Sequence, residues 1–592
     1  MTEPNPPDET RSVEQPPNYV GSLAEAHGVS GYTKTPDGTV VYAAYNDGTY
    51  DLRTRDHQLT DAEGDITSPK WLQGRESLLA YRDKNGTEQF DLLEVDLETG
   101  AIRSVLDDQF LNFKARQHPT DTNRIAFVSN RDRSLDLYTL HLDEGKITKR
   151  SEADEPVMGY AWSPSGQRIV YQAGTFENSR LRLVDLHLDR DDVFLDEPDS
   201  EQSLAFTDDG YGAWSEAGIV FTTNHQTGYR ELAVADGDGD YELQYVNNRD
   251  KYDPQWTVDG DIVFLESRGG NRRLCVLSEG EVTSFERIGM NIDVKAIDGD
   301  VYYKHSSPAT TGDLRRNGTT LVEESRVDVR TVVPEDISYE SFDGQAISAR
   351  LYKPAEEPIG GIVKAHGGPE AQHYNRLDMV TQTLVHAGFE VLAPDFRGSL
   401  GYGREFRKAS DGDLGGDDLT DVVAGAEYLR NRGRDTVGIL GASYGGYMAL
   451  MGVGATDAFD MGASVCGVVN WKTTVEDARQ YLGDVVIRKF EGTPAEKPDR
   501  YEERSPITYV GDIDVPLLLV QGANDPRVPQ SEAEQLVASL SEREIDHEYL
   551  LFENEGHGIE RTANRIEYIT QTVEFFTEHV GNRRTTAIPT TR

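Results

Sequence analysis

Three side chains in the last third of the chain have the chemical types, and the order along the chain, of a nucleophile, an acid and a base. Ser443 is the central residue of 441–445, which read G-A-S-Y-G and so match the G-x-S-x-G pattern. Asp525 and His557 follow in that order. A serine hydroxyl is a weak nucleophile at neutral pH and needs a base within hydrogen-bond reach. We therefore predict that His557 takes the proton of Ser443 and that Asp525 orients His557.

The segments around Ser443 indicate how its hydroxyl is held. Residues 437–440 predict a β-strand, and residues 446–450 predict the start of a helix. A strand, a sharp turn and a helix form a nucleophile elbow, where glycines are needed because the strained turn has no room for neighbouring Cβ atoms. An ordinary glycine-rich turn is the alternative, and this setting makes it the weaker interpretation.

Asp525 and His557 each come shortly after a largely apolar stretch, residues 516–520 and 548–552 respectively. In a parallel sheet, the loops that follow the strands meet at one edge. We therefore expect both side chains to meet Ser443 there. A surface-loop histidine would be the simpler interpretation of His557 alone, but the joint placement of all three residues favours a triad.

An oxyanion hole needs two donors aimed at the same oxygen. The backbone N–H of Tyr444 is the first candidate. The second comes from residues 366–369, which read H-G-G-P after an early strand. We predict the N–H of Gly368 as this donor, with Gly367 as the alternative, and a structural role for His366.

The organisation of the chain changes near residue 326. After that point apolar strands alternate with helix-length segments, which predicts a doubly wound, mostly parallel sheet covered on both faces, the α/β hydrolase class. We divide the chain into an N-terminal lead-in (1–27), an all-β propeller (28–325), an α/β hydrolase domain (326–582) and a flexible tail (583–592).

The propeller prediction comes from a repeated strand that often follows a Pro- or Gly-containing turn. Successive copies begin 38 to 50 residues apart, a spacing typical of propeller blades. Seven copies predict seven blades, and an irregular run of β-hairpins in a sandwich is the alternative. The repeated strands cover residues 40–42, 78–81, 125–127, 169–171, 219–221, 262–264 and 301–303.

The charge of the chain is strongly acidic. Lys and Arg total 59 against 104 Asp and Glu, for a net charge of −45. This charge argues against nucleic acid and anionic membranes as partners. The acidic residues are spread along the whole chain, so we favour a halophilic protein, adapted to high internal salt, over an acidic interaction protein.

The cysteines and the N-terminal residues bear on the cellular compartment. Cys275 and Cys466 are the only cysteines and are far apart in sequence, which predicts buried thiols rather than a disulfide framework. Residues 1–15 contain no apolar run, and no stretch of 18 apolar residues occurs. We expect a cytoplasmic protein without a membrane segment.

Over about residues 335–580 the sequence resembles the prolyl oligopeptidase family of serine peptidases, near its acylaminoacyl peptidase and oligopeptidase branch. The N-terminal half resembles the family only in its propeller pattern. The residues that carry the resemblance are 366–369, 395–403, 441–448, 501–506, Asp525 and 555–558.

The resemblance implies cleavage of short peptides through an acyl-enzyme, with the propeller screening the site and with no metal or organic cofactor. It also implies an Arg that binds substrate after the strand that ends at Cys466. The candidates for substrate binding are Arg479 and Arg488, with Val468, Val469 and Trp471 as pocket lining.

Several alternatives stay open. A carboxylesterase would use the same triad. A dipeptidyl peptidase would need a propeller glutamate pair, and Glu323-Glu324 is such a pair, but it lies almost at the domain junction and is better interpreted as solvated charge. A propeller binding module with a vestigial hydrolase is disfavoured because every triad member is present. The oligomeric state stays open, and a homo-oligomer is compatible with the sequence.

Overall fold

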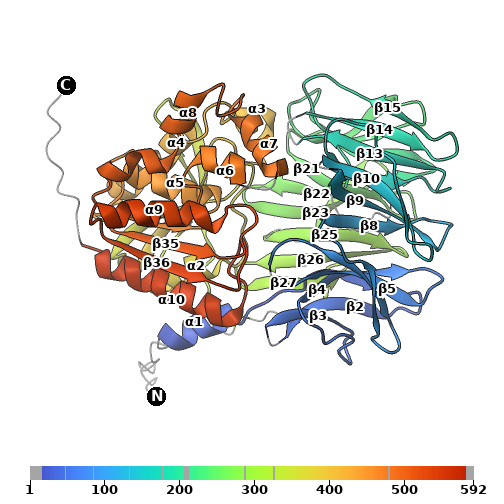
Figure 1. Ribbon diagram of the computed structural model, residues 1–592, viewed down its shortest axis with the longest axis horizontal. Helices are drawn as coiled ribbons and strands as arrows, with labels where there is room; N and C mark the ends of the chain where they lie inside the picture. The colour runs from blue at the N-terminus through green and yellow to red at the C-terminus, as the bar shows by residue number, and fades with distance from the viewer. Residues whose placement is uncertain are drawn as a thin grey trace, which may run out of the picture.

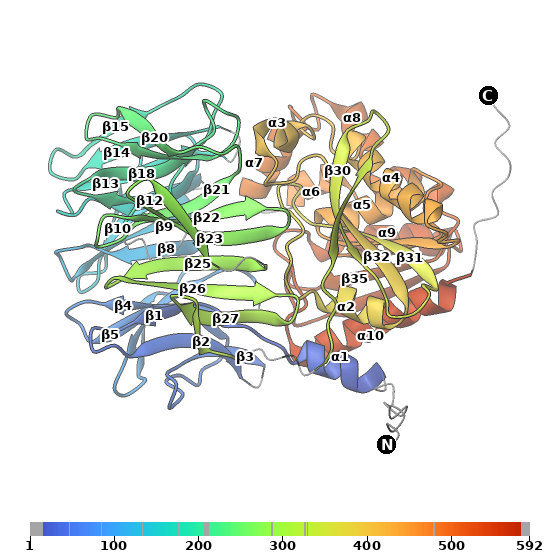
Figure 2. The ribbon, with the colours of Figure 1, turned by 180° about the vertical axis from the view of Figure 1, so that it is seen from behind.

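The computed structural model contains two bodies that lie side by side, a β-rich N-terminal body and an α/β C-terminal body (Figures 1 and 2). The structure describes residues 16–581, except 47, 85, 133, 176–177, 206–211, 286–287, 325–326, 328 and 478–479. For residues 16–18 and 480–481 the structure describes only the backbone.

The N-terminal body is a β-propeller. Within the described residues its strands form six antiparallel sheets, and the last of these contains two four-stranded units joined by one parallel pairing, Arg272 with Met290. The first three sheets contain β1 (Tyr32–Lys34), β2 (Val40–Asn46) and β3 (Thr49–Arg53); β4 (Asp65–Leu72), β5 (Ser77–Asp83), β6 (Asp91–Asp96) and β7 (Ile102–Leu106); and β8 (Asn112–Gln117), β9 (Arg124–Asp132), β10 (Ser134–His141) and β11 (Lys146–Lys149).

The other three sheets complete the propeller. They contain β12 (Val157–Trp162), β13 (Arg168–Gly174), β14 (Ser179–Asp185) and β15 (Arg190–Leu195); β16 (Gln202–Ser203), β17 (Trp214–Ser215), β18 (Gly218–Thr223), β19 (Glu231–Ala235) and β20 (Tyr241–Tyr245); and β21 (Lys251–Trp256), β22 (Ile262–Arg268), β23 (Asn271–Ser278), β24 (Glu281–Phe285), β25 (Met290–Ile297), β26 (Asp300–Ser307), β27 (Thr310–Arg316) and β28 (Thr319–Val322).

The repeated strands of the sequence pattern all lie in strands of the propeller. They correspond to β2, β5, β9, β13, β18, β22 and β26. Their apolar side chains are buried between neighbouring sheets; for example, Ile125 and Phe127 of β9 pack in one cluster with Leu79 of β5. Packing of each sheet on the next therefore supplies the core that a single sheet cannot form alone.

The C-terminal body is built on one eight-stranded sheet in the order β29-β30-β32-β31-β33-β34-β35-β36. The pairings from β32 through β31 to β36 are parallel, and β29 and β30 extend the sheet in antiparallel fashion. The strands are β29 (Glu335–Glu340), β30 (Ala346–Tyr352), β31 (Gly360–Ala365), β32 (Phe389–Asp395), β33 (Val437–Ala442), β34 (Met461–Val465), β35 (Leu517–Gly522) and β36 (His547–Phe552).

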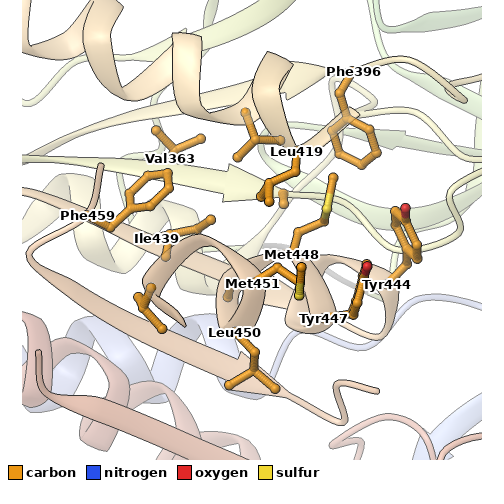
Figure 3. Close-up of a cluster of buried hydrophobic side chains, with 14 of the residues drawn as sticks. Val363, Phe396, Leu419, Ile439, Tyr444, Tyr447, Met448, Leu450, Met451 and Phe459 are labelled. Carbon is orange, nitrogen blue, oxygen red and sulfur yellow. The ribbon is translucent and has the colours of Figure 1, made fainter. Parts of the chain in front are cut away.

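Helices cover both faces of this sheet. One face packs against α2 and α10, and the other against α4, α5 and α9. Figure 3 shows Tyr444 and Met448 of α5 in the same buried cluster as Ile439 of β33 and Val363 of β31. The helices are α1 (Pro16–Ala24), α2 (Met379–His386), α3 (Gly403–Lys408), α4 (Asp417–Asn431), α5 (Tyr444–Gly454), α6 (Trp471–Asp477), α7 (Gln480–Lys489), α8 (Pro498–Glu503), the 3₁₀ helix η1 (Pro506–Asp512), α9 (Gln530–Glu542) and α10 (Thr562–His579).

Polar contacts join the two bodies. The buried carboxylate of Glu201 in the propeller accepts hydrogen bonds from Arg230 at 2.8 Å and from Arg407 of α3 at 2.9 Å. Ser267 of β22 donates to Gln372 at 3.0 Å. At the N-terminal end, α1 packs against α10 beside the propeller (Figure 1). In the part of the chain that the structure describes, no helix has the length and apolar character needed to cross a bilayer.

Candidate active site

Ser443 occupies a strained turn between β33 and α5. Its backbone has φ +57° and ψ −121°, a combination that non-glycine residues rarely adopt. A Cβ on Gly441 would lie 2.1 Å from the carbonyl oxygen of Gly445, and a Cβ on Gly445 would lie 2.2 Å from that of Ala365. The two glycines are therefore required by close backbone approach, as expected for a nucleophile elbow.

Asp525 and His557 are hydrogen-bonded to each other. His557 Nδ1 donates to Asp525 Oδ2 at 2.7 Å. The other carboxylate oxygen accepts the backbone N–H groups of Arg527 at 2.8 Å and Val528 at 3.0 Å. Because the buried carboxylate accepts at both oxygens, it fixes the proton on Nδ1 and leaves the lone pair on Nε2 of His557.

The sheet brings the three predicted triad residues to one edge. The N–H of Ser443 donates to Val465 at the end of β34, and the N–H of Cys466 donates to Val520 of β35, both at 2.8 Å. The loop after β36 then meets the loop after β35, since a Cβ on Gly522 would lie 2.1 Å from the carbonyl oxygen of Gly556. Segments far apart in sequence therefore converge at the carboxyl ends of adjacent parallel strands.

The predicted oxyanion donors lie around Ser443. A Cβ on Gly367 would lie 3.4 Å from the Cβ of Ser443 and 4.0 Å from its Oγ. The N–H of Gly368 belongs to the peptide unit that follows Gly367. Because Gly367 lies close to Ser443, this N–H lies in the neighbourhood of Ser443. Tyr444 begins α5, where backbone N–H groups have no partner within the helix. The assignment of Tyr444 and Gly368 stays a prediction.

His366 holds the loop that carries Gly367. Its Nε2 lies 2.8 Å from Ser399 Oγ, and its ring stacks on Phe396 with centroids 4.1 Å apart. Burial lowers the pKa of His366, so its ring is neutral near pH 7. These contacts are those of a structural residue.

Asp418 of α4 was not singled out from the sequence and contacts Tyr444, the residue that follows Ser443. Its carboxyl contacts the hydroxyl of Tyr444, and its Oδ1 accepts the N–H of Leu419 at 2.8 Å. Burial raises the pKa of Asp418 to about 7. An acidic residue at the start of a helix is common, so no sequence signal distinguishes Asp418 from its neighbours.

Glu532 of α9 is a second residue that the sequence did not reveal. Its Oε2 accepts the backbone N–H groups of Val469 at 3.0 Å and Asn470 at 2.7 Å. Burial raises the pKa of Glu532. This carboxylate fixes the loop between β34 and α6, which carries the predicted pocket lining.

The predicted substrate residues have different settings. Val468, Val469 and Trp471 are buried in the cluster around the Tyr444 side chain, and their role as pocket lining stays a prediction. Arg488 is exposed on α7. Arg479 lies outside the described residues.

The loop between β5 and β6 of the propeller contacts the loops that carry Asp525 and His557. A Cβ on Gly556 would lie 2.2 Å from the carbonyl oxygen of Gly86. Arg527 forms an ion pair with Glu88 at 2.8 Å. The propeller therefore contacts the loops that carry Asp525 and His557 directly. This contact joins segments that are distant along the chain, so no pattern in the sequence indicates it.

Comparison with known proteins agrees with this geometry. Residues 375–583 match the profile of the prolyl oligopeptidase family. The hydrolase domain belongs to the prolyl oligopeptidase family. The chain is thus a serine-type peptidase, as its resemblance to this family implied.

The curated relatives of this chain include two kinds of enzyme. Dipeptidyl aminopeptidase BIII of Pseudoxanthomonas mexicana is 27% identical over 88% of this chain and 81% of its own. Acylamino-acid-releasing enzyme 1 of Oryza sativa subsp. japonica is 24% identical over 37% of this chain and 30% of its own.

Solved structures share the two-domain fold. A puromycin-hydrolyzing peptidase of Mycobacterium tuberculosis superposes with a TM-score of 0.83 at 18% identity, covering 95% of this chain and 96% of its own. The acylaminoacyl peptidase of Pyrococcus horikoshii gives a TM-score of 0.72 at 16% identity, covering 96% of this chain and 98% of its own. At these identities the likeness establishes the propeller-plus-hydrolase fold.

Proposed function

We propose that this protein hydrolyses peptide bonds in short peptides through an acyl-enzyme formed on Ser443. The observation that carries the proposal is the 2.7 Å hydrogen bond between His557 and Asp525 at the sheet edge that also holds the strained Ser443. A strained serine at an elbow, together with an oriented imidazole, is the arrangement that activates a hydroxyl for acyl transfer.

In the first half of the reaction, Ser443 attacks the scissile carbonyl while Nε2 of His557 takes its proton. The imidazolium then protonates the leaving amine, which departs and leaves an ester on Ser443. Asp525 holds the Nδ1 proton in place and stabilises the positive ring. Deacylation repeats these steps with a water molecule as the nucleophile, which releases the acid product and restores the serine.

The developing oxyanion is stabilised by the N–H groups of Tyr444 and Gly368. Tyr444 is anchored through its hydroxyl to the buried Asp418, and the loop of Gly368 is held by His366. Preorganised donors of this kind typically contribute about 10²–10³-fold each to turnover.

Acylaminoacyl peptidase or oligopeptidase activity is the form of this function that we favour. The propeller contacts the loops of the triad, which supports selection for short substrates. For the second candidate, dipeptidyl peptidase activity, the support is the relative named dipeptidyl aminopeptidase, which aligns with both domains. Against it, Glu324 accepts a hydrogen bond from the Tyr42 hydroxyl at 2.9 Å, and Glu323 is exposed at the domain junction.

We also propose seven blades, a halophilic and cytoplasmic protein, and substrate binding by Arg488. Seven blades are supported by the seven repeated strands and by the two four-stranded units of the last propeller sheet. The halophilic proposal is supported by the charge of −45. Arg488, exposed on α7, is the remaining described candidate for binding substrate.

A substrate panel tests the proposed function. We would compare p-nitroanilides that carry a free amino acid, an acetylated amino acid or a dipeptide, together with a simple aliphatic ester. Preference for the acetylated compound supports acylaminoacyl peptidase activity, and preference for the dipeptide supports the second candidate. Hydrolysis of the ester alone would favour a carboxylesterase and contradict the peptidase proposal. Ser443→Ala serves as the background control.

A further inference from the structure

Cys466 lies beside the acid and base of the triad. It follows β34, and its backbone has φ +47°. Its Sγ, a carboxylate oxygen of Asp525 and a ring nitrogen of His557 lie within 4.8 Å of one another. Burial, and then the Asp525 carboxylate, raise the pKa of the Cys466 thiol, so the unliganded side chain is an uncharged thiol. The sequence analysis did not place Cys466 beside Asp525 and His557, because the three residues come from separate loops.

These donors suit one class of cation. Thiolate, imidazole and carboxylate are the ligands that Zn²⁺ takes, at about 2.0–2.3 Å. Donor atoms in a tetrahedral site are then roughly 3–4 Å apart, so atoms within 4.8 Å need shifts of only about an ångström. Hard cations such as Mg²⁺ and Ca²⁺ prefer all-oxygen sites. The side chain of His557 is 13% exposed whereas that of Asp525 is fully buried, so the imidazole lies on the side from which an ion would enter.

We propose that Cys466, Asp525 and His557 form a binding site for a thiophilic divalent cation, with Zn²⁺ as the representative ion, and that its occupancy inhibits the enzyme. The inhibition rests on the proposed function, since two of the three ligands belong to the triad. If the ring binds the ion through Nδ1, the hydrogen bond to Asp525 is lost. If it binds through Nε2, the lone pair that accepts the serine proton is occupied. In both geometries turnover stops.

Cys466 loses its thiol proton to solvent when the ion binds, so one proton is released for each ion that binds.

The first test titrates peptidase activity with ZnCl₂. We expect inhibition that EDTA reverses and that MgCl₂ does not produce. Cys466→Ala should keep its activity without metal and should raise the Zn²⁺ concentration for half inhibition at least about tenfold, because loss of a direct ligand costs no less than loss of a second-sphere partner. Cys466→Ser, which keeps the side-chain size, should behave in the same way. Cys275→Ala is the matched control, because Cys275 is the other buried thiol and lies in the propeller.

A second test does not depend on activity. Co²⁺ added to Ser443→Ala should give a thiolate charge-transfer band that saturates at one ion per chain, and this band should be lost in the Ser443→Ala/Cys466→Ala double variant. A Cys466-dependent band, found together with a lack of peptidase activity in the unmodified protein, would refute the proposed function and leave the site standing. Equal Zn²⁺ sensitivity of Cys466→Ala and the unmodified protein, or no Cys466-dependent band, would overturn the site.

Discussion

The propeller and the hydrolase domain assemble their sheets in opposite ways. In the described part of the propeller, most neighbouring strands follow one another along the chain, and every pairing except that of Arg272 with Met290 is antiparallel. In the hydrolase domain, β31 pairs with both β32 and β33, and helices separate strands that are neighbours in the sheet. Local assembly leaves a repeat in the sequence, whereas non-local assembly collects distant loops at one edge.

This difference separates the roles of the two regions. The proposed chemistry lies on the non-local edge, which carries Ser443, Asp525 and His557. The propeller meets that edge through Gly86 and Glu88, which touch the acid and base loops without supplying a reacting group. Substitutions at this edge should therefore alter the chemical step itself. Substitutions in the propeller should act only by moving the loops that carry Asp525 and His557.

The largest effect is expected from Asp525→Asn at the sheet edge. The amide cannot hold the Nδ1 proton as the carboxylate does, so the ring adopts the wrong tautomer, and kcat should fall about 10⁴-fold. Steady-state kinetics at saturating substrate measures this loss. A fall of less than tenfold would show that another group orients His557.

Salt should affect both regions together. The Debye length grows from about 3 Å at 1 M salt to about 30 Å at 0.01 M, which exposes the self-repulsion of a chain with charge −45. Thermal melting in molar and in 10 mM KCl should show a large drop in Tm and loss of activity at low salt. Equal Tm values in the two buffers would contradict the halophilic proposal.

A smaller effect is expected from Glu88→Gln in the propeller. The substitution removes the ion pair between Glu88 and Arg527, and the backbone N–H of Arg527 donates to Asp525. A partly exposed pair is worth at most about 1 kcal/mol, so kcat should fall by about two- to fivefold without a change in Tm. Asp189→Asn, which removes the partner of Arg150 elsewhere in the propeller, is the control and should leave kcat unchanged. Equal kinetics for the two variants would remove the propeller from the positioning of the triad.

A different kind of effect, on folding stability rather than on turnover, is expected at Asp418, which contacts the hydroxyl of Tyr444. Its pKa is about 7 in the folded protein against an ordinary 3.8, so between these values the folded state binds more protons than the unfolded state. This contribution to stability is present below pH 3.8 and is lost as pH rises to 7. Asp418→Asn should therefore gain on the order of a few kcal/mol relative to the unmodified protein between pH 5 and pH 8. Urea unfolding at both pH values measures the difference, and identical pH slopes would contradict it.

The repeated strands and the glycine-bounded turn around Ser443 could be predicted from the sequence, because both depend on short-range patterns of apolar residues and glycines. The catalytic roles of Ser443, Asp525 and His557 stay a proposal. The sequence did not predict Asp418, Glu532 or the contact of Gly86 with Gly556. These depend on which way a side chain points from a helix, or on how a propeller loop meets the hydrolase domain. Neither the direction of a side chain nor the meeting of two domains produces a repeat or a motif in the sequence.

The central claim is that His557 activates Ser443, and covalent labelling tests it most directly. A fluorophosphonate should label the native protein once per chain, and peptide mapping should place the label on Ser443. His557→Ala should slow this labelling by several orders of magnitude while the circular dichroism spectrum is unchanged. A label on another residue, or a labelling rate that does not depend on His557, would contradict the account.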